Sequence, residues 1–334
     1  MIVALLIVLV AGVAAPVQGA ETLDQVITLA QAVDAEPVTD MRVEEVVEQA
    51  QRYQLWIFLI STVLVIALLF AGGLLQPGGF AKAGARDLSP MPAPVWLFAA
   101  FVVLLAMLSA AAIFRSTGWL DRSPYDADQQ AIIVTLTGYL LGIVAGLGML
   151  FILKRSAPDA GMSMGGLDIP VGFGCFLLAY PLIGLAGMAA VALYTQVNSG
   201  QGPPQISHPV LEQIVNDPKN AWSWALIAGA VFGAPIVEEL IYRVFLQSAL
   251  IKITKSPWVA IIATSIGFAL MHRVGDHPVP WHALLPILMV GITCGVGYER
   301  TKRVGVPITM HVCFNALNVL LALLIGSGGV ETAV

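Results

Sequence analysis

Long apolar runs, separated by short polar connectors, occupy most of the chain after residue 53. A helix needs roughly 20 apolar residues to cross the hydrocarbon layer of a bilayer, and eight runs approach or exceed that length. The eight runs lie near 55–76, 94–114, 131–153, 169–195, 221–251, 257–272, 281–298 and 306–326, of which the sixth and seventh are short. The pattern predicts an all-α polytopic membrane protein with about eight transmembrane helices.

The first twenty residues form an apolar stretch followed by small residues and Pro16, a pattern typical of a secretory signal. They lack a basic start apart from the terminal amine, so an uncleaved anchor helix is the alternative. The next segment, 21–52, is acidic, with Leu, Val and Ile at helical spacing, which predicts solvated or interfacial helices.

Composition agrees with a membrane location and excludes some partners. Hydrophobic residues make up 58% of the chain and charged residues 11%, with a mean hydropathy of +0.85, which does not fit a soluble surface. The net charge is −5, and no basic patch is present that would bind nucleic acid.

Lys and Arg residues in the connectors predict the orientation. The connectors after the first, third, fifth and seventh runs hold nine of them, and the opposite side holds six. Since positive residues favour the cytoplasmic side, the acidic segment is predicted to lie outside the cytoplasm. We expect a multi-pass protein of the cell membrane.

Ionisable residues are concentrated in the last third of the chain, and the fifth run contains the sequence EELIYR. Glu239 and Arg243 have the i,i+4 spacing that favours an ion pair. Glu238 points about 100° away from Glu239 on a regular helix, and its own i+4 neighbour is Tyr242, whose hydroxyl group could donate to it. A carboxylate within a membrane helix that lacks a full counter-charge is a candidate general base.

Two further polar motifs accompany this one. The sixth run ends in FALMH at His272, and the eighth contains HVCFN, in which His311 and Asn315 lie one turn apart. Such residues suit activation of a water molecule by Glu238 and His272, and stabilisation of an oxyanion by His311 and Asn315. No Ser or Cys nucleophile is required.

The three ordered motifs resemble those of the CAAX prenyl protease and bacteriocin-processing family, also called CPBP or Abi, of intramembrane proteases. The resemblance covers about Ala221 to Leu324. It implies that Glu238 and His272 activate water and that His311 and Asn315 stabilise the oxyanion. Glu239 and Arg243 complete the first motif, and Tyr242 is a supporting residue.

The resemblance also implies an activity, and together with the apolar runs and the signal-like start it gives a domain organisation. The expected activity is hydrolysis of a peptide bond in a membrane-associated or lipid-modified polypeptide, with the lipid bilayer as the other partner. The predicted divisions are a signal or anchor (1–20), an acidic extracytoplasmic segment (21–52), a four-helix membrane region (53–200), a loop (201–220), a CPBP-like protease domain (221–326) and a tail (327–334).

Other hypotheses use the same residues. Two His and one Glu, here His272, His311 and Glu238, could instead bind a catalytic zinc ion, so a cofactor is not required but zinc is an alternative. A transporter would also place ionisable residues inside helices, and an immunity-type protein of the same fold would have no catalytic activity.

Overall fold

The computed structural model describes residues 40–76, 78–82, 84–204, 209–274 and 278–327. The predicted signal or anchor and most of the acidic segment lie outside the described residues. In the described part of the chain, all regular elements are helices and no strand occurs. The predicted all-α polytopic fold is therefore confirmed.

The helices follow the predicted runs closely. Seven spans are long and apolar enough to cross a membrane, and α13, with 15 residues, accounts for the short sixth run. The main helices are α3 (Asp40–Ala71), α5 (Ala93–Ser116), α7 (Ala127–Ser156), α8 (Asp168–Val197), α13 (Pro257–Met271), α14 (Leu284–Thr301) and α15 (Gly305–Ser327). The fifth span is the continuous stretch α10 (Ala221–Ala228), η1 (Gly229–Gly233), α11 (Ala234–Glu239), η2 (Leu240–Leu246) and α12 (Gln247–Thr254). Shorter helices are α4 (Gly79–Lys82), α6 (Trp119–Arg122), α9 (Pro209–Asn216) and the 3₁₀ turn η3 (Trp281–Ala283).

Local sequence explains where several helices begin. The Asp126 side chain accepts a hydrogen bond from the Gln129 N–H at the start of α7, and Ser256 does the same for Val259 in α13. Pro257 then occupies the first turn of α13, where a missing N–H costs nothing. The first span differs from expectation because α3 begins at Asp40, so the end of the acidic segment continues into the membrane helix.

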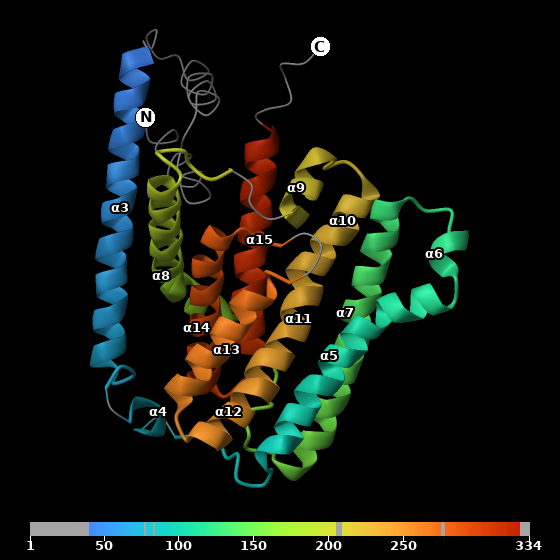
Figure 1. Cartoon of the computed structure of the whole chain (residues 1–334). Coiled ribbons are helices and arrows are strands. Elements are labelled where there is room, and N and C mark those ends of the chain that lie inside the picture. The colour runs from blue at the N-terminus through green and yellow to red at the C-terminus, as the bar shows by residue number, and fades with distance from the viewer. Residues whose placement is uncertain (1–39, 77, 83, 205–208, 275–277, 328–334) are drawn as a thin grey trace.

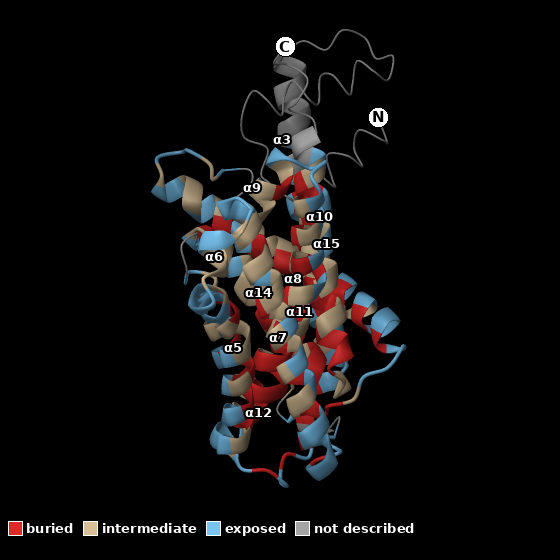
Figure 2. Cartoon of the chain, turned by 90° about the vertical axis from the view of Figure 1, so that its right-hand side faces the viewer, coloured by how far each residue is buried: buried red, intermediate tan, exposed pale blue. Residues whose placement is uncertain are grey.

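The helices form a bundle with the fifth span near its centre (Figure 1). At one edge α3 packs on α8, and at the opposite edge α5 pairs with α7. Between these edges, α8 contacts α14 and α15, and α13 contacts α12 and α14. Buried residues, shown red in Figure 2, gather between the helices around α7, α11 and α12.

Glycines on α7 allow the fifth span to approach closely. A side chain at Gly142 would overlap Val237, and one at Gly146 would overlap Leu240. From Gly142 to Gly146 the contact moves from Val237 to Leu240, so α7 and the fifth span run in the same direction. This is expected for the third and fifth spans of a membrane protein. This close packing fixes the position of α11, which carries the motif acids.

Candidate active site

The two motif glutamates lie on α11, a short α-helical stretch between two π-helical segments, η1 and η2. π-helical turns within a membrane-spanning helix are wider than α-helical ones and are frequent at functional sites. Glu238 and Glu239 were predicted to point about 100° apart, and they approach different nitrogen atoms of one imidazole ring, that of His311.

Glu239 is fully buried and binds two partners. Its Oε2 accepts a hydrogen bond from Arg243 Nε at 2.9 Å, so the predicted i,i+4 ion pair is present. Its Oε1 lies 3.0 Å from His311 Nδ1, across 72 positions of sequence. An ionised carboxylate can only accept, so the hydrogen-bond network assigns the proton to Nδ1 of His311. Glu239 thus holds the imidazole in one orientation.

Glu238 lies on the other side of that ring. Its Oε2 is 3.7 Å from His311 Nε2, close enough for charge interaction but too long for a direct hydrogen bond. The Glu238 side chain is 23% exposed, whereas those of Glu239 and Arg243 are 0% exposed and that of His311 is 4% exposed. Within this cluster of four residues, Glu238 is therefore the group that an incoming molecule reaches.

His272 ends α13 and is connected to the cluster through Phe268. Its Nδ1 lies 2.9 Å from the Phe268 carbonyl oxygen, which can only accept, so Nδ1 carries the proton and Nε2 is left as an acceptor. The Phe268 ring packs edge-on against His272, at a centroid distance of 4.9 Å, and against His311, at 5.5 Å. One aromatic ring therefore contacts both motif histidines.

Asn315 lies one turn after His311 on α15, as expected. Its amide nitrogen donates to the backbone carbonyl of Ala230 at 2.7 Å, within the π-helical segment η1. Because a π-helical stretch does not follow the regular i,i−4 ladder, a side-chain donor from a neighbouring helix can satisfy one of its carbonyls. The remaining N–H of the Asn315 amide is not used in this contact.

Two tyrosines lie near Glu238. The predicted hydrogen bond from Tyr242 is not formed; instead its ring packs edge-on against Phe268 at 5.3 Å. Tyr139 of α7 packs against the face of Gly233, in the π-helical segment that precedes α11. Sequence reasoning missed Tyr139 because it lies far from the three motifs, although its position in the glycine-spaced segment GYLLGIVAG marks a helix face built for close packing.

The described residues contain no group of three or more His, Cys, Asp or Glu side chains positioned to hold a metal ion. The three residues of the zinc alternative are arranged differently: Glu238 contacts His311, while His272 reaches His311 only through the Phe268 ring. We therefore derive no chemical step through a metal.

Comparisons with known proteins agree with the resemblance inferred from the motifs. Residues 220–317 match the family model described as Type II CAAX prenyl endopeptidase Rce1-like. The chain is also similar to a curated protein of Bacillus subtilis (strain 168) named "Putative membrane peptidase YdiL", with 25% identity over 189 residues, which are 55% of this chain and 70% of that protein. No solved structure matches the chain. The family resemblance is thus confirmed for residues 220–317, a range that contains every motif residue and excludes Tyr139.

Proposed function

We propose that the protein is an intramembrane endopeptidase in which Glu238 activates a water molecule that attacks a peptide carbonyl. One observation carries this proposal: a partly exposed carboxylate lies beside a buried, oriented imidazole in the segment that matches a peptidase family. A general base must be accessible to water, and Glu238 is partly exposed. The donors to an oxyanion must be held rigidly, and His311 is buried.

The geometry supports a role for each residue. The Glu238 carboxylate takes a proton from the water as its oxygen bonds to the carbonyl carbon, and His272 Nε2 is available as a second acceptor for that water. The C–N bond then breaks, and the proton passes to the leaving amine. Phe268 keeps the two imidazoles apart, so each can act on a different atom of the substrate.

The Glu239 contact constrains the role of His311. With its Nδ1 proton donated to Glu239, the ring can donate from Nε2 only when it is doubly protonated. His311 then donates to the developing oxyanion from Nε2, and the free N–H of Asn315 is the second candidate donor. Glu239 is accordingly a positioning residue.

The substrate and the orientation in the membrane are part of the proposal. A membrane-associated or lipid-modified polypeptide fits a site built within spanning helices, and the family match points to the same class. We further propose that the protein lies in the cell membrane with its acidic N-terminal segment outside the cytoplasm. Reporter fusions at the connectors after α5 and α7 should report opposite sides of the membrane.

The decisive experiment is peptide cleavage by the protein purified in detergent, with and without a chelator. Wild-type protein should cleave some members of a peptide panel in the presence of chelator, and Glu238→Gln and His272→Ala should abolish that cleavage. Glu212→Gln, an exposed acid on α9, is the matched control and should retain it. Cleavage that chelator abolishes would instead favour the zinc-dependent alternative, and cleavage retained by Glu238→Gln would refute the proposed role of Glu238.

A further inference from the structure

Buried polar side chains continue along the fifth span beyond the candidate active site. Glu239 is followed at four-residue steps by Arg243 and then Gln247, and all three are 0% exposed. Burying one polar group after another along a membrane helix costs free energy unless each group finds a partner. The partners of these residues therefore show what this row of polar groups does.

Arg243 is only partly satisfied. Its Nε donates to Glu239, and its guanidinium carbon lies 5.3 Å from the centroid of the Phe268 ring. Its other two nitrogen atoms, Nη1 and Nη2, are buried and have no hydrogen-bond partner among the described residues. Each carries N–H groups that water would otherwise satisfy.

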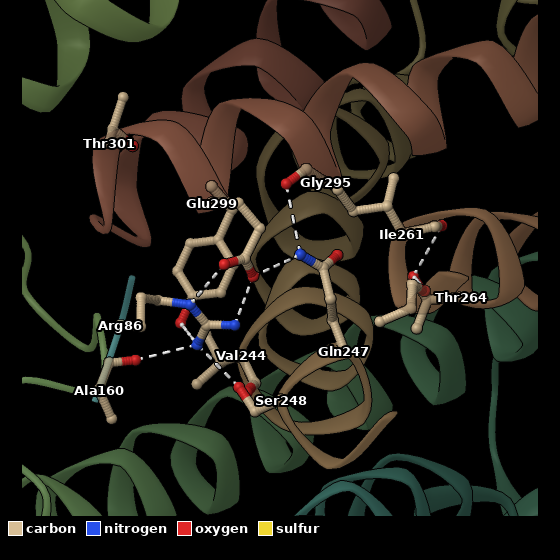
Figure 3. A network of polar contacts seen from close by, with 12 residues as sticks. Arg86, Ala160, Val244, Gln247, Ser248, Ile261, Thr264, Gly295, Glu299 and Thr301 are labelled. Atoms are coloured by element: carbon tan, nitrogen blue, oxygen red, sulfur yellow. Dashed lines mark hydrogen bonds and ion pairs between the residues drawn. The ribbon is translucent and has the colours of Figure 1, made fainter. Parts of the chain in front are cut away.

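Gln247, one turn further on, is also only partly satisfied, and the atom concerned is an acceptor rather than a donor. Its Nε2 donates to the Gly295 carbonyl at 3.3 Å and to Glu299 Oε1 at 2.8 Å, as Figure 3 shows. Those two contacts fix the amide orientation, because the carbonyl and the carboxylate accept hydrogen bonds. The amide oxygen Oε1 is buried and, in the described part of the chain, has no donor.

Gly295 packs close to this oxygen. A methyl group at that position would lie 2.9 Å from Gln247 Oε1 and 3.0 Å from an Ile261 carbon, so a larger residue would displace the amide. The preceding residue on α14, Cys294, is also buried, and α14 contacts η2, the segment that carries Arg243. The same stretch of α14 therefore faces both orphaned groups.

We propose that an internal water-binding site lies between Arg243 and Gln247, with Nη1 and Nη2 as donors and Oε1 as acceptor. Buried waters typically make about three hydrogen bonds to polar groups that lack other partners, which matches this set. Leaving a buried donor or acceptor unsatisfied would cost about 1–3 kcal/mol for each group. A bound water removes that cost and links the two side chains.

The water site joins two clusters into one buried polar column. At one end, Glu239 binds both Arg243 and His311. At the other, Gln247 binds Glu299, which pairs with Arg86 from the segment before α5. Gln247 is therefore a positioning residue: through the water it holds the Arg243 guanidinium, and hence Glu239 and His311. This positioning role depends on the proposed peptidase activity, whereas the water site itself does not.

The water site is tested directly by an experimental structure of the full chain at a resolution that shows ordered water. Density is expected within hydrogen-bond distance of an Arg243 Nη atom and of Gln247 Oε1, and Gly295→Ala should displace it. A direct contact of these Nη atoms with a protein acceptor, or a dry gap, would overturn the water site whatever the activity.

The positioning role is tested by kinetics. Gln247→Met keeps the side-chain volume but removes the amide, and kcat should fall about 10- to 100-fold with little change in KM, since small misplacement of catalytic groups has effects of that size. The pH profile of kcat should also shift because the Glu239 charge beside His311 is held less firmly. Thr264→Val is the matched control: Thr264 is buried and bonds only within its own helix, to Ala260 and Ile261.

The outcomes separate the two claims. A Gln247→Met variant with the kcat and pH profile of Thr264→Val would refute the positioning role, even if the water is seen. Wild-type protein that cleaves no peptide would refute the proposed function, while the density between Arg243 and Gln247 would still decide the water site.

Discussion

The bundle contains two buried charge clusters that differ in how completely their hydrogen bonds are satisfied. Around Arg86, one guanidinium nitrogen donates to the Ala160 carbonyl, the Ser248 hydroxyl and the Tyr298 hydroxyl, and the other two donate to Glu299. Around Glu238, the carboxylate is partly exposed and its Oε2 stands 3.7 Å from Nε2 of His311. The Arg86 cluster links connectors to helices, whereas the Glu238 cluster contains a carboxylate that is accessible to a bound molecule.

The two clusters differ in burial and pairing as a structural role and the proposed catalytic role would require. A fully paired buried ion pair gains little net free energy, but losing one partner is costly, which makes it suited to fixing a fold. A carboxylate with an incomplete set of partners can exchange protons with a bound molecule. Four predictions test this distinction, from the largest expected effect to the smallest.

The largest effect is expected on catalysis at Glu238. Glu238→Gln keeps the shape of the side chain but removes the base, so the cleavage rate should fall about 10²- to 10⁴-fold. Because this side chain is partly exposed, the unfolding midpoint in detergent should stay close to that of wild type, within the scatter of about 0.5 kcal/mol seen for surface changes. A large loss of stability would mean that Glu238 is a structural residue.

The opposite behaviour is expected at Arg86. Arg86→Met leaves Glu299 buried without its counter-charge, which should cost about 3–5 kcal/mol of stability. The double variant Arg86→Met/Glu299→Met removes both charges and should be less destabilised than the two single changes together. Thermal unfolding of the four proteins in detergent measures this coupling, and strict additivity would contradict the assigned ion pair.

Asn315 should combine both kinds of effect at a smaller size. Asn315→Ala removes the donor to the Ala230 carbonyl, with an expected loss of about 1–3 kcal/mol in stability. It should also slow cleavage about 10²-fold if the second N–H stabilises the oxyanion. Measuring rate and unfolding on the same preparation separates the two roles. Slower cleavage without loss of stability would show that the Ala230 contact is unimportant.

The smallest effect is expected at Asp87, an exposed residue next to Arg86. Hydrogen bonds from the Ser89 side chain and backbone N–H lower the pKa of the Asp87 carboxyl from its usual value. Its contribution to stability is therefore present above the unfolded-state pKa and is lost as pH falls through the lower folded-state pKa. The difference in unfolding midpoint between wild type and Asp87→Asn should shrink as pH falls from about 6 to about 3. A difference that grows on acidification would contradict this assignment.

Most of the fold could be predicted from local sequence. The eight apolar runs correspond to the observed helices because a membrane span requires about 20 apolar residues in one continuous segment. The Glu239–Arg243 pair was also predictable, since i,i+4 neighbours meet on one helix. The contact of Glu238 with His311 was not, because it depends on how α11 and α15 pack against each other.

The sequence by itself determined which segments are helical, where polar residues enter the apolar core, and which three motifs resemble those of the peptidase family. Only the tertiary structure decided that His311 lies between the two glutamates, that Tyr139 of α7 packs against Gly233, and that Arg86 meets Glu299 across 213 positions. The physical reason is the distance along the chain over which each kind of signal acts. Periodicity and spacing act within a single helix, whereas these contacts depend on how separate helices pack against one another.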